Sequence, residues 1–192
     1  MNKTIQVGEF TVEICRGVRQ TLTLKAGKNG KIIASAPLML EERRIVEFVE
    51  QKKERLRKML ERAAKNSAVQ PLTAEECAAL KARANAEIPA LVEKYAAQMG
   101  VSYNRVTIRM QKTRWGSCSS KGNLNFNALL MLMPPEVRDS VVVHELAHRK
   151  EMNHSRKFYE QVYAAFPQYD ECHRWLKEHG SALLARAKEA EQ

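Results

Sequence analysis

The residues best suited to chemistry in this chain are His144, Glu145 and His148, which form a His-Glu-x-x-His pattern. Residues four apart lie on one face of a helix, so the imidazoles of His144 and His148 can converge on one cation. Glu145 lies about 100° further round the helix, where its carboxylate can hold a water on that cation and take its proton. The pattern therefore predicts a metal centre that hydrolyses its substrate.

A catalytic zinc ion usually has three protein ligands, and His154 is the expected third. An unbroken helix would carry His154 roughly 9 Å further along its axis than His148, out of reach of the same ion. We therefore expect the helix to end near Lys150 and the chain to fold back over residues 151–153. Asn153 tolerates the left-handed backbone conformation that could close this turn.

The alternative interpretation is a buried helix whose histidines are hydrogen-bonded in the core. An apolar helix has little reason to turn His, Glu and His inward unless they coordinate an ion, so the metal site is favoured. Zn²⁺ is the expected ion, although imidazole also suits other divalent transition metals such as Ni²⁺.

Zinc on three neutral imidazoles would lower the pKa of a water to about 7, and Glu145 would accept the proton. The deprotonated water could then attack a carbonyl carbon or, equally, a phosphoryl group. Either reaction needs a partner for the oxyanion. Four side chains near the histidines in sequence are candidates: Arg114, Lys121, Arg149 and Tyr159.

The helix that carries the histidines is expected to begin at Pro135, a residue suited to the first turn of a helix. It is apolar on nearly every side, which predicts a buried and rigid support. Before it we expect strands over residues 106–110 and 124–130, and after it helices over 155–165 and 169–178, the last ended by Gly180. Phe158 belongs to the core in this interpretation, and His173 and His179 lie at the surface.

The N-terminal part predicts a different arrangement. Alternating residues over 4–35 predict a small antiparallel sheet, and residues 41–66 predict one long amphipathic helix. A second long helix is expected from Thr73 to Met99, kinked or split at Pro89 and ended by Gly100. Charged residues after position 185 predict a frayed tail.

These elements predict an α+β protein with a hinge in residues 66–71. Residues 1–70 would form a basic domain of β-sheet and long helix, and residues 71–192 a metal-hydrolase domain with a short sheet and the buried histidine helix. At 192 residues with 44% hydrophobic content, the chain is long and apolar enough for a real core.

No apolar run approaches the roughly 20 residues of a membrane span, and the N-terminus lacks the pattern of a signal peptide, so a cytoplasmic protein is expected. The cysteines are far apart, with no C-x-x-C pair, which predicts free thiols rather than disulfides or a second zinc site. They are Cys15, Cys77, Cys118 and Cys172. Cys118 is interpreted as a packing residue rather than a nucleophile.

The formal net charge is +10, and its distribution is uneven. Residues 94–135 contain no acidic side chain and six cationic ones, and this segment leads directly into the histidine helix. The segment can be a solvated basic surface, or it can attract an anionic substrate or a nucleic-acid backbone. Two rival functions therefore stay open: a phosphohydrolase or pyrophosphatase acting on a nucleoside triphosphate, and a nucleic-acid-binding adaptor with a structural metal.

Four groups of residues together resemble the YgjP-like metallopeptidase family, a group of small bacterial zincins, and more weakly the SprT-like proteases. The groups are Trp115-Gly116-Ser117-Cys118 followed by Gly122 to Leu129, the segment from Val142 to His148, Asn153-His154-Ser155 with Phe158, and Trp175-Leu176-Lys177. Residues 16–37 are also similar to a strand-and-turn region of that family.

The resemblance implies a zincin-like domain and a small metallopeptidase that acts on a peptide substrate. It also implies a zinc site of His144, His148 and His154, with Glu145 as the catalytic carboxylate. Metzincins share the spacing of the three histidines but place Gly where this chain has Glu151, and the chain shows no Met-turn, so that family is disfavoured.

Overall fold

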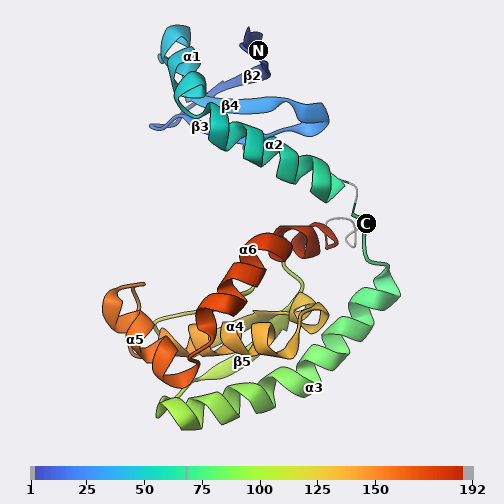
Figure 1. The fold of residues 1–192 in the computed structure, drawn as a ribbon, viewed down its shortest axis with the longest axis vertical. Helices are drawn as coiled ribbons and strands as arrows, with labels where there is room; N and C mark the ends of the chain where they lie inside the picture. The colour runs from blue at the N-terminus through green and yellow to red at the C-terminus, as the bar shows by residue number, and fades with distance from the viewer. Residues whose placement is uncertain (1–2, 68, 188–192) are drawn as a thin grey trace. The chain divides into compact units, whose positions relative to one another are not determined.

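The computed structural model describes residues 3–67 and 69–187, and the chain divides into two compact units, Met1–Ala68 and Val69–Gln192. Within the described residues, six α-helices and two small sheets make an α+β protein, as predicted. Figure 1 shows the elements of each unit. None of the helices in the described ranges has the length and apolar character that a membrane span requires.

The first unit is a four-stranded sheet with two helices. The strands are β1 (Lys3–Val7), β2 (Phe10–Gly17), β3 (Thr23–Ala26) and β4 (Ile32–Pro37), with a short 3₁₀ turn η1 (Lys28–Gly30) before β4. The strand order is β1-β2-β4-β3, and β2 and β4 run parallel. The sheet is therefore mixed: the pairs β1–β2 and β3–β4 are antiparallel, as predicted, and the parallel pair β2–β4 was not predicted. The β3–β4 hairpin places β4 between β2 and β3, and this central position buries Ile32, Ala34 and Ala36 completely.

The expected single helix over residues 41–66 is two helices, α1 (Glu42–Gln51) and α2 (Lys53–Ser67). The break lies at Lys52, whose backbone angles of φ −107° and ψ 9° are not helical. Ile45 and Val49 of α1 and Leu56 of α2 join one buried cluster with the sheet residues. The two helices on either side of the break therefore each bury a short apolar face in the same core.

The second unit begins with α3 (Ala74–Met99), a long helix whose two ends were predicted correctly. Thr73 and Glu76 form the capping box, and Gly100 ends the helix in the left-handed conformation at φ 62°. The helix is not split at Pro89. Proline has no backbone N–H, so the carbonyl of Asn85 loses its hydrogen bond within the helix. Both residues lie on the solvent-exposed side of the helix, where water can bind that carbonyl.

A three-stranded sheet follows, formed by β5 (Arg105–Arg109), β6 (Gly116–Cys118) and β7 (Asn123–Asn127). The order is β5-β7-β6, with β5 parallel and β6 antiparallel to β7. Strand β6 was not predicted, because three residues are too few to show an alternating pattern. It is the edge strand beside the histidine helix.

The predicted strand over residues 124–130 ends at Asn127, where the 3₁₀ helix η2 (Ala128–Leu132) begins. The side chain of Asn127 is fully buried, and its oxygen accepts a hydrogen bond from the backbone N–H of Leu129 at 3.1 Å. This side-chain cap turns the chain out of the strand, which an apolar run in the sequence did not reveal.

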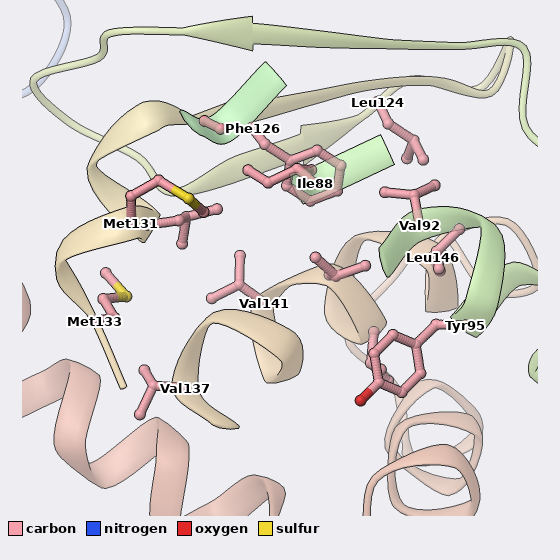
Figure 2. Packing of buried hydrophobic residues seen from close by; sticks show 14 of the residues in the cluster. Ile88, Val92, Tyr95, Leu124, Phe126, Met131, Met133, Val137, Val141 and Leu146 are labelled. Atoms are coloured by element: carbon pink, nitrogen blue, oxygen red, sulfur yellow. The ribbon is translucent and has the colours of Figure 1, made fainter. Parts of the chain in front are cut away.

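The three remaining helices are α4 (Pro135–Ala147), α5 (Arg156–Ala165) and α6 (Tyr169–Ala185). Helix α4 carries His144 and contacts α3, α5 and α6 (Figure 1). Figure 2 shows its buried side chains Val137, Val141 and Leu146 packed with Ile88 and Val92 of α3 and Leu124 and Phe126 of β7. The core of this unit therefore fixes α4 from several sides, as its apolar sequence predicted.

Helix α6 continues beyond the predicted end, and Gly180 lies inside it. Gly180 is buried, and a Cβ placed there would lie 3.3 Å from Nε1 of Trp115. The glycine therefore makes room for an indole ring and does not end the helix. The tail begins later than expected, because the carbonyl of Arg186 accepts a hydrogen bond from Leu72 N–H at 2.9 Å and Ala187 is buried. The rest of the predicted tail, 188–192, is outside the described residues.

All four cysteines are free thiols, as predicted. Cys77 and Cys172 are buried in the core of the second unit, and Cys118 packs against that core.

Candidate metal centre

The chain reverses after α4, three residues earlier than predicted. The helix ends at Ala147, and the backbone N–H groups of Lys150 and Glu151 both donate to the carbonyl of Ala147 at 3.0 Å. Asn153 does not close the turn in a left-handed conformation, since Asn29 has the only positive φ among the non-glycine residues described. The bonds to Ala147 tighten the last turn of the helix and make a left-handed residue unnecessary.

The reversal brings the imidazoles of His144, His148 and His154 together. One ring nitrogen from each lies within 4.8 Å of the other two, and the Nε2 atoms of His144 and His154 are 3.0 Å apart. Tetrahedral zinc with Zn–N distances of about 2.0–2.1 Å needs nitrogens roughly 3.3 Å apart. The three side chains therefore fit one ion after small movements of the rings.

Phe158 of α5 lies against all three imidazoles. Its ring centroid is 4.9 Å from that of His144, 4.6 Å from that of His148 and 4.8 Å from that of His154. The Phe158 side chain is fully buried, as the sequence predicted, and the three histidine rings pack against it.

Two hydrogen bonds fix the orientation of the rings. Nδ1 of His148 donates to the carbonyl of Glu151 at 3.2 Å, and Nδ1 of His144 lies 2.8 Å from the hydroxyl of Tyr169. Each bond occupies Nδ1 and leaves Nε2 for another partner. Burial also lowers the pKa of His144 to about 3 and lowers the pKa of His148. Both imidazoles are therefore neutral at pH 7, which is the form that binds a metal.

Glu145 is a buried carboxylate beside this cluster, only 7% exposed. Burial raises the pKa of Glu145 to about 8, and the positive charge of Arg114 opposes this rise. The backbone of Gly116 lies against the carboxylate, since a Cβ at position 116 would be 2.6 Å from Cγ and Oε1 of Glu145. Only glycine leaves this space.

A pocket of about 200 Å³ joins Glu145 to His144. Its walls are mostly apolar and come from α4, α6 and the start of β6. They are Trp115, Gly116, Ser140, Val141, His144, Glu145, Tyr169, His173 and Leu176. A buried carboxylate and an imidazole thus face one small, largely apolar space, and electrostatic interactions are stronger in apolar surroundings than in water.

The four oxyanion candidates lie in different surroundings. The guanidinium of Arg149 donates to the carbonyls of Ser102 and Ser120 at 2.9 and 3.2 Å, so it holds two loops together. The ring of partly buried Tyr159 lies 6.5 Å from that of His154. Arg114 is exposed and within electrostatic reach of Glu145, and Lys121 is exposed in the turn before β7.

Sequence reasoning missed Tyr169 and placed His173 incorrectly. His173 is partly buried rather than at the surface, with Nδ1 3.4 Å from the hydroxyl of Tyr169, and both residues line the pocket. Their spacing of four residues on α6 was the available signal, because it puts them on one helical face. His179 is exposed, as expected, and its ring stacks on Trp175 at 4.5 Å.

Solved structures that are similar to part of the chain include two metallopeptidase zymogens. The metallopeptidase zymogen of Pyrococcus abyssi abylysin is 26% identical, with a TM-score of 0.43, over 47% of this chain and 93% of that one. The metallopeptidase zymogen of Methanocaldococcus jannaschii jannalysin is 23% identical, with a TM-score of 0.43, over 48% of this chain and 95% of that one. Comparison with curated proteins gave no match.

The profile of the YgjP-like metallopeptidase domain matches residues 70–179, which is more than half of the chain. The match extends from the residues before α3 into α6, and it includes the three clustered histidines, Glu145 and every residue that lines their pocket. The chain therefore belongs to the YgjP-like metallopeptidase domain family.

Proposed function

We propose that His144, His148 and His154 bind Zn²⁺ and that Glu145 is the general base of peptide-bond hydrolysis. The observation that carries this proposal is the convergence of three ring nitrogens within 4.8 Å, beside Glu145, a residue that is only 7% exposed. Neutral imidazoles suit zinc, and three of them leave a fourth position free for water or substrate.

Zinc bound here would supply a Lewis acid that polarises the substrate carbonyl and lowers the pKa of a water to about 7. The positive charge of a bound zinc ion would lower the raised pKa of Glu145 and keep its carboxylate ionised. Glu145 then accepts a proton from the attacking water and returns it to the nitrogen of the leaving amine. Gly116 leaves the space that this carboxylate occupies, and the apolar wall of Trp115 and Leu176 excludes bulk water from it.

The edge of β6 is suited to hold the backbone of an extended peptide. The carbonyl of Trp115 accepts a hydrogen bond from the N–H of Asn127 at 2.8 Å, and the N–H of Ser119 donates to the carbonyl of Asn123 at 3.0 Å. The backbone N–H and C=O groups of the odd-numbered residues of β6 therefore face β7. In an antiparallel pair, the backbone groups of every second residue face away from the partner strand. The N–H and C=O groups of Gly116 and Cys118 therefore face the outer edge of β6, where a substrate strand could bind them. A peptide bound there would pass next to Glu145.

Turnover by the purified, zinc-loaded protein tests this proposal against the phosphohydrolase alternative. We expect cleavage of unfolded peptide substrates that stops with a chelator and returns with Zn²⁺. Release of phosphate or pyrophosphate from nucleoside triphosphates, with every peptide in a broad mixture left intact, would overturn the proposal.

Gly116→Ala is expected to lower kcat/KM by about 100-fold, because a new methyl group displaces the Glu145 carboxylate and misplacement of a catalytic group by about 1 Å has an effect of this size. The bound zinc should remain. Gly17→Ala is the matched control, since a Cβ at position 17 has no atom within 4 Å. Full activity in Gly116→Ala would show that the carboxylate position is not critical.

Tyr169→Phe is expected to weaken zinc binding by about 10-fold, the lower end of the effect of losing a group that orients a metal ligand. The hydroxyl lies 2.8 Å from Nδ1 of His144, so its removal frees that ring to rotate. Tyr163→Phe removes an exposed hydroxyl that donates to Asp170 and should leave zinc affinity unchanged. Competition with a chromogenic chelator measures both variants, and equal affinities would contradict the orienting role.

A further inference from the structure

A second, basic groove lies on the outer face of the β5-β7-β6 sheet. It has a volume of about 520 Å³ and is lined by Arg109, Met110, Gln111, Lys112, Thr113, Arg114, Ser117 and Asn125. Asn125 and Ser117 are paired across β7 and β6, and their side chains are hydrogen-bonded at 3.3 Å. Leu124 and Phe126 are fully buried in the core, and side chains alternate along a strand, so the groove and the core lie on opposite faces of the sheet.

The groove is strongly cationic. Three of its lining residues are Arg109, Lys112 and Arg114, and none is acidic, since no Asp or Glu occurs in residues 94–135. Arg109 and Arg114 are exposed, and neither forms an ion pair with a carboxylate in the part of the chain that the structure describes. The guanidinium of Arg109 is therefore available to an anionic ligand, and Arg114, whose charge also acts on Glu145, adds to the positive field of the groove.

The loop that carries these charges is held in place. Asn127 is fully buried, and its side-chain amide donates to the carbonyls of Gln111 and Arg114 at 2.8 and 2.9 Å. Its oxygen also accepts from the backbone N–H of Gln111 at 3.4 Å. A buried side chain thus ties both ends of the segment 111–114 to β7, and the groove is preorganised rather than formed by a free loop.

The groove adjoins the proposed catalytic centre through β6. Gly116 contacts Glu145, and the next residue, Ser117, lines the groove. Side chains of an extended peptide alternate between the two faces of a sheet. A peptide beside β6 would therefore direct one side chain toward α4 and the pocket at Glu145, and the neighbouring side chain toward the groove.

We propose that this groove is a substrate subsite for an acidic side chain, so that the enzyme favours peptides with Glu or Asp next to the residue held at the pocket. The proposal rests on the peptidase function argued above. A carboxylate matches the forked donors of arginine, and Ser117 and Asn125 add neutral hydrogen-bonding groups. A nucleic-acid backbone is disfavoured, because it needs a row of cations along an extended track, whereas these three lie within one six-residue segment.

Binding to the zinc-loaded Glu145→Gln variant tests the subsite without turnover. Pairs of labelled peptides are used in which one position carries either Glu or Gln, and each pair places this position at a different point of the peptide. The protein is titrated into each peptide, and into a labelled single-stranded oligonucleotide, at low salt. At one position the Glu peptide should bind about fivefold tighter, which corresponds to about 1 kcal/mol for a partly solvated ion pair. Adding Arg109→Gln should abolish this difference.

Arg105→Gln is the matched control. Arg105 is also an exposed arginine of β5, four residues away and on the same face of the strand, but it does not line the groove. The variant loses the same charge, so it should keep the fivefold preference. Equal binding of Glu and Gln peptides at every position would overturn the proposal, as would an equal loss of preference in Arg105→Gln.

A nucleic-acid site would give another result: oligonucleotide binding that falls steeply with salt and is lost in Arg109→Gln, with no discrimination between Glu and Gln peptides. That outcome also overturns the subsite. If the wild-type protein binds the Glu peptide through Arg109 but cleaves no peptide, the groove is supported as a binding site for an acidic side chain and the peptidase function fails. The two proposals can therefore fail separately.

Discussion

Glu145→Gln is expected to lower kcat/KM for peptide hydrolysis by about 10³-fold, the range for loss of a general base. Glutamine has nearly the same shape as glutamate but cannot accept a proton from water. Zinc should stay bound, because the three imidazoles are untouched. The measurement is peptide turnover together with the metal content of the same preparation.

The matched control is Glu151→Gln. Glu151 lies in the reversal between His148 and His154, and its backbone carbonyl, not its side chain, accepts the hydrogen bond from His148. Removing its charge should leave kcat/KM within about twofold of the wild type, because Gln keeps the same backbone carbonyl and nearly the same side-chain shape. Full activity in Glu145→Gln, or loss of its zinc, would contradict the role given to Glu145.

His154→Ala is expected to weaken zinc binding by about 10²- to 10³-fold. Structural zinc sites with four ligands bind with roughly 10–16 kcal/mol, so one ligand contributes about 2.5–4 kcal/mol. The His154 side chain is exposed, so its truncation should leave the melting temperature of the metal-free protein nearly unchanged. Chelator competition gives the affinity, and thermal unfolding without metal gives the stability.

His179→Ala is the control for this variant. His179 is also exposed, and it stacks on Trp175 away from the three clustered histidines. It should keep the wild-type affinity for zinc. Wild-type affinity in His154→Ala would show that the ion has only two imidazole ligands, and an equal loss in both variants would show that the affinity does not depend on the cluster.

The parts of the fold that local sequence controls were predicted correctly. Thr73 and Glu76 identify the start of α3, and Gly100 identifies its end, because capping depends on residues within one turn. The apolar character of α4 likewise indicated a buried helix before any contact was known. Local chemistry was sufficient for each of these features.

The features that depend on distant residues were missed. The parallel pairing of β2 with β4 depends on where the β3–β4 hairpin inserts, and no local pattern records this. Gly180 is a glycine because Trp115, 65 positions earlier, packs against it, yet in the sequence it reads as a helix end. A glycine that is needed for packing against a distant residue cannot be told, in the sequence, from a glycine that ends a helix.

The site divides in the same way. The spacing of His144 and His148 predicted a shared helical face, and the need for a third ligand predicted the reversal that brings His154 back. The sequence could place Tyr169 only on one helical face with His173, and it gave Gly116 no role in the site. Each residue contacts the site only after α6 and β6 have packed against α4. The acid-free segment was recognised as unusual, but only the fold shows that part of it forms a groove beside β6.

X-ray absorption at the zinc edge of the wild-type protein tests the central claim most directly, namely that one ion is held by His144, His148 and His154 while Glu145 remains free. We expect one zinc per chain, with three imidazole nitrogens at about 2.0–2.1 Å and no sulfur ligand. The spectrum of Glu145→Gln should be the same, and that of His154→Ala should show two imidazoles. A wild-type spectrum with two imidazoles, or one that changes in Glu145→Gln because the carboxylate is itself a ligand, would contradict the account.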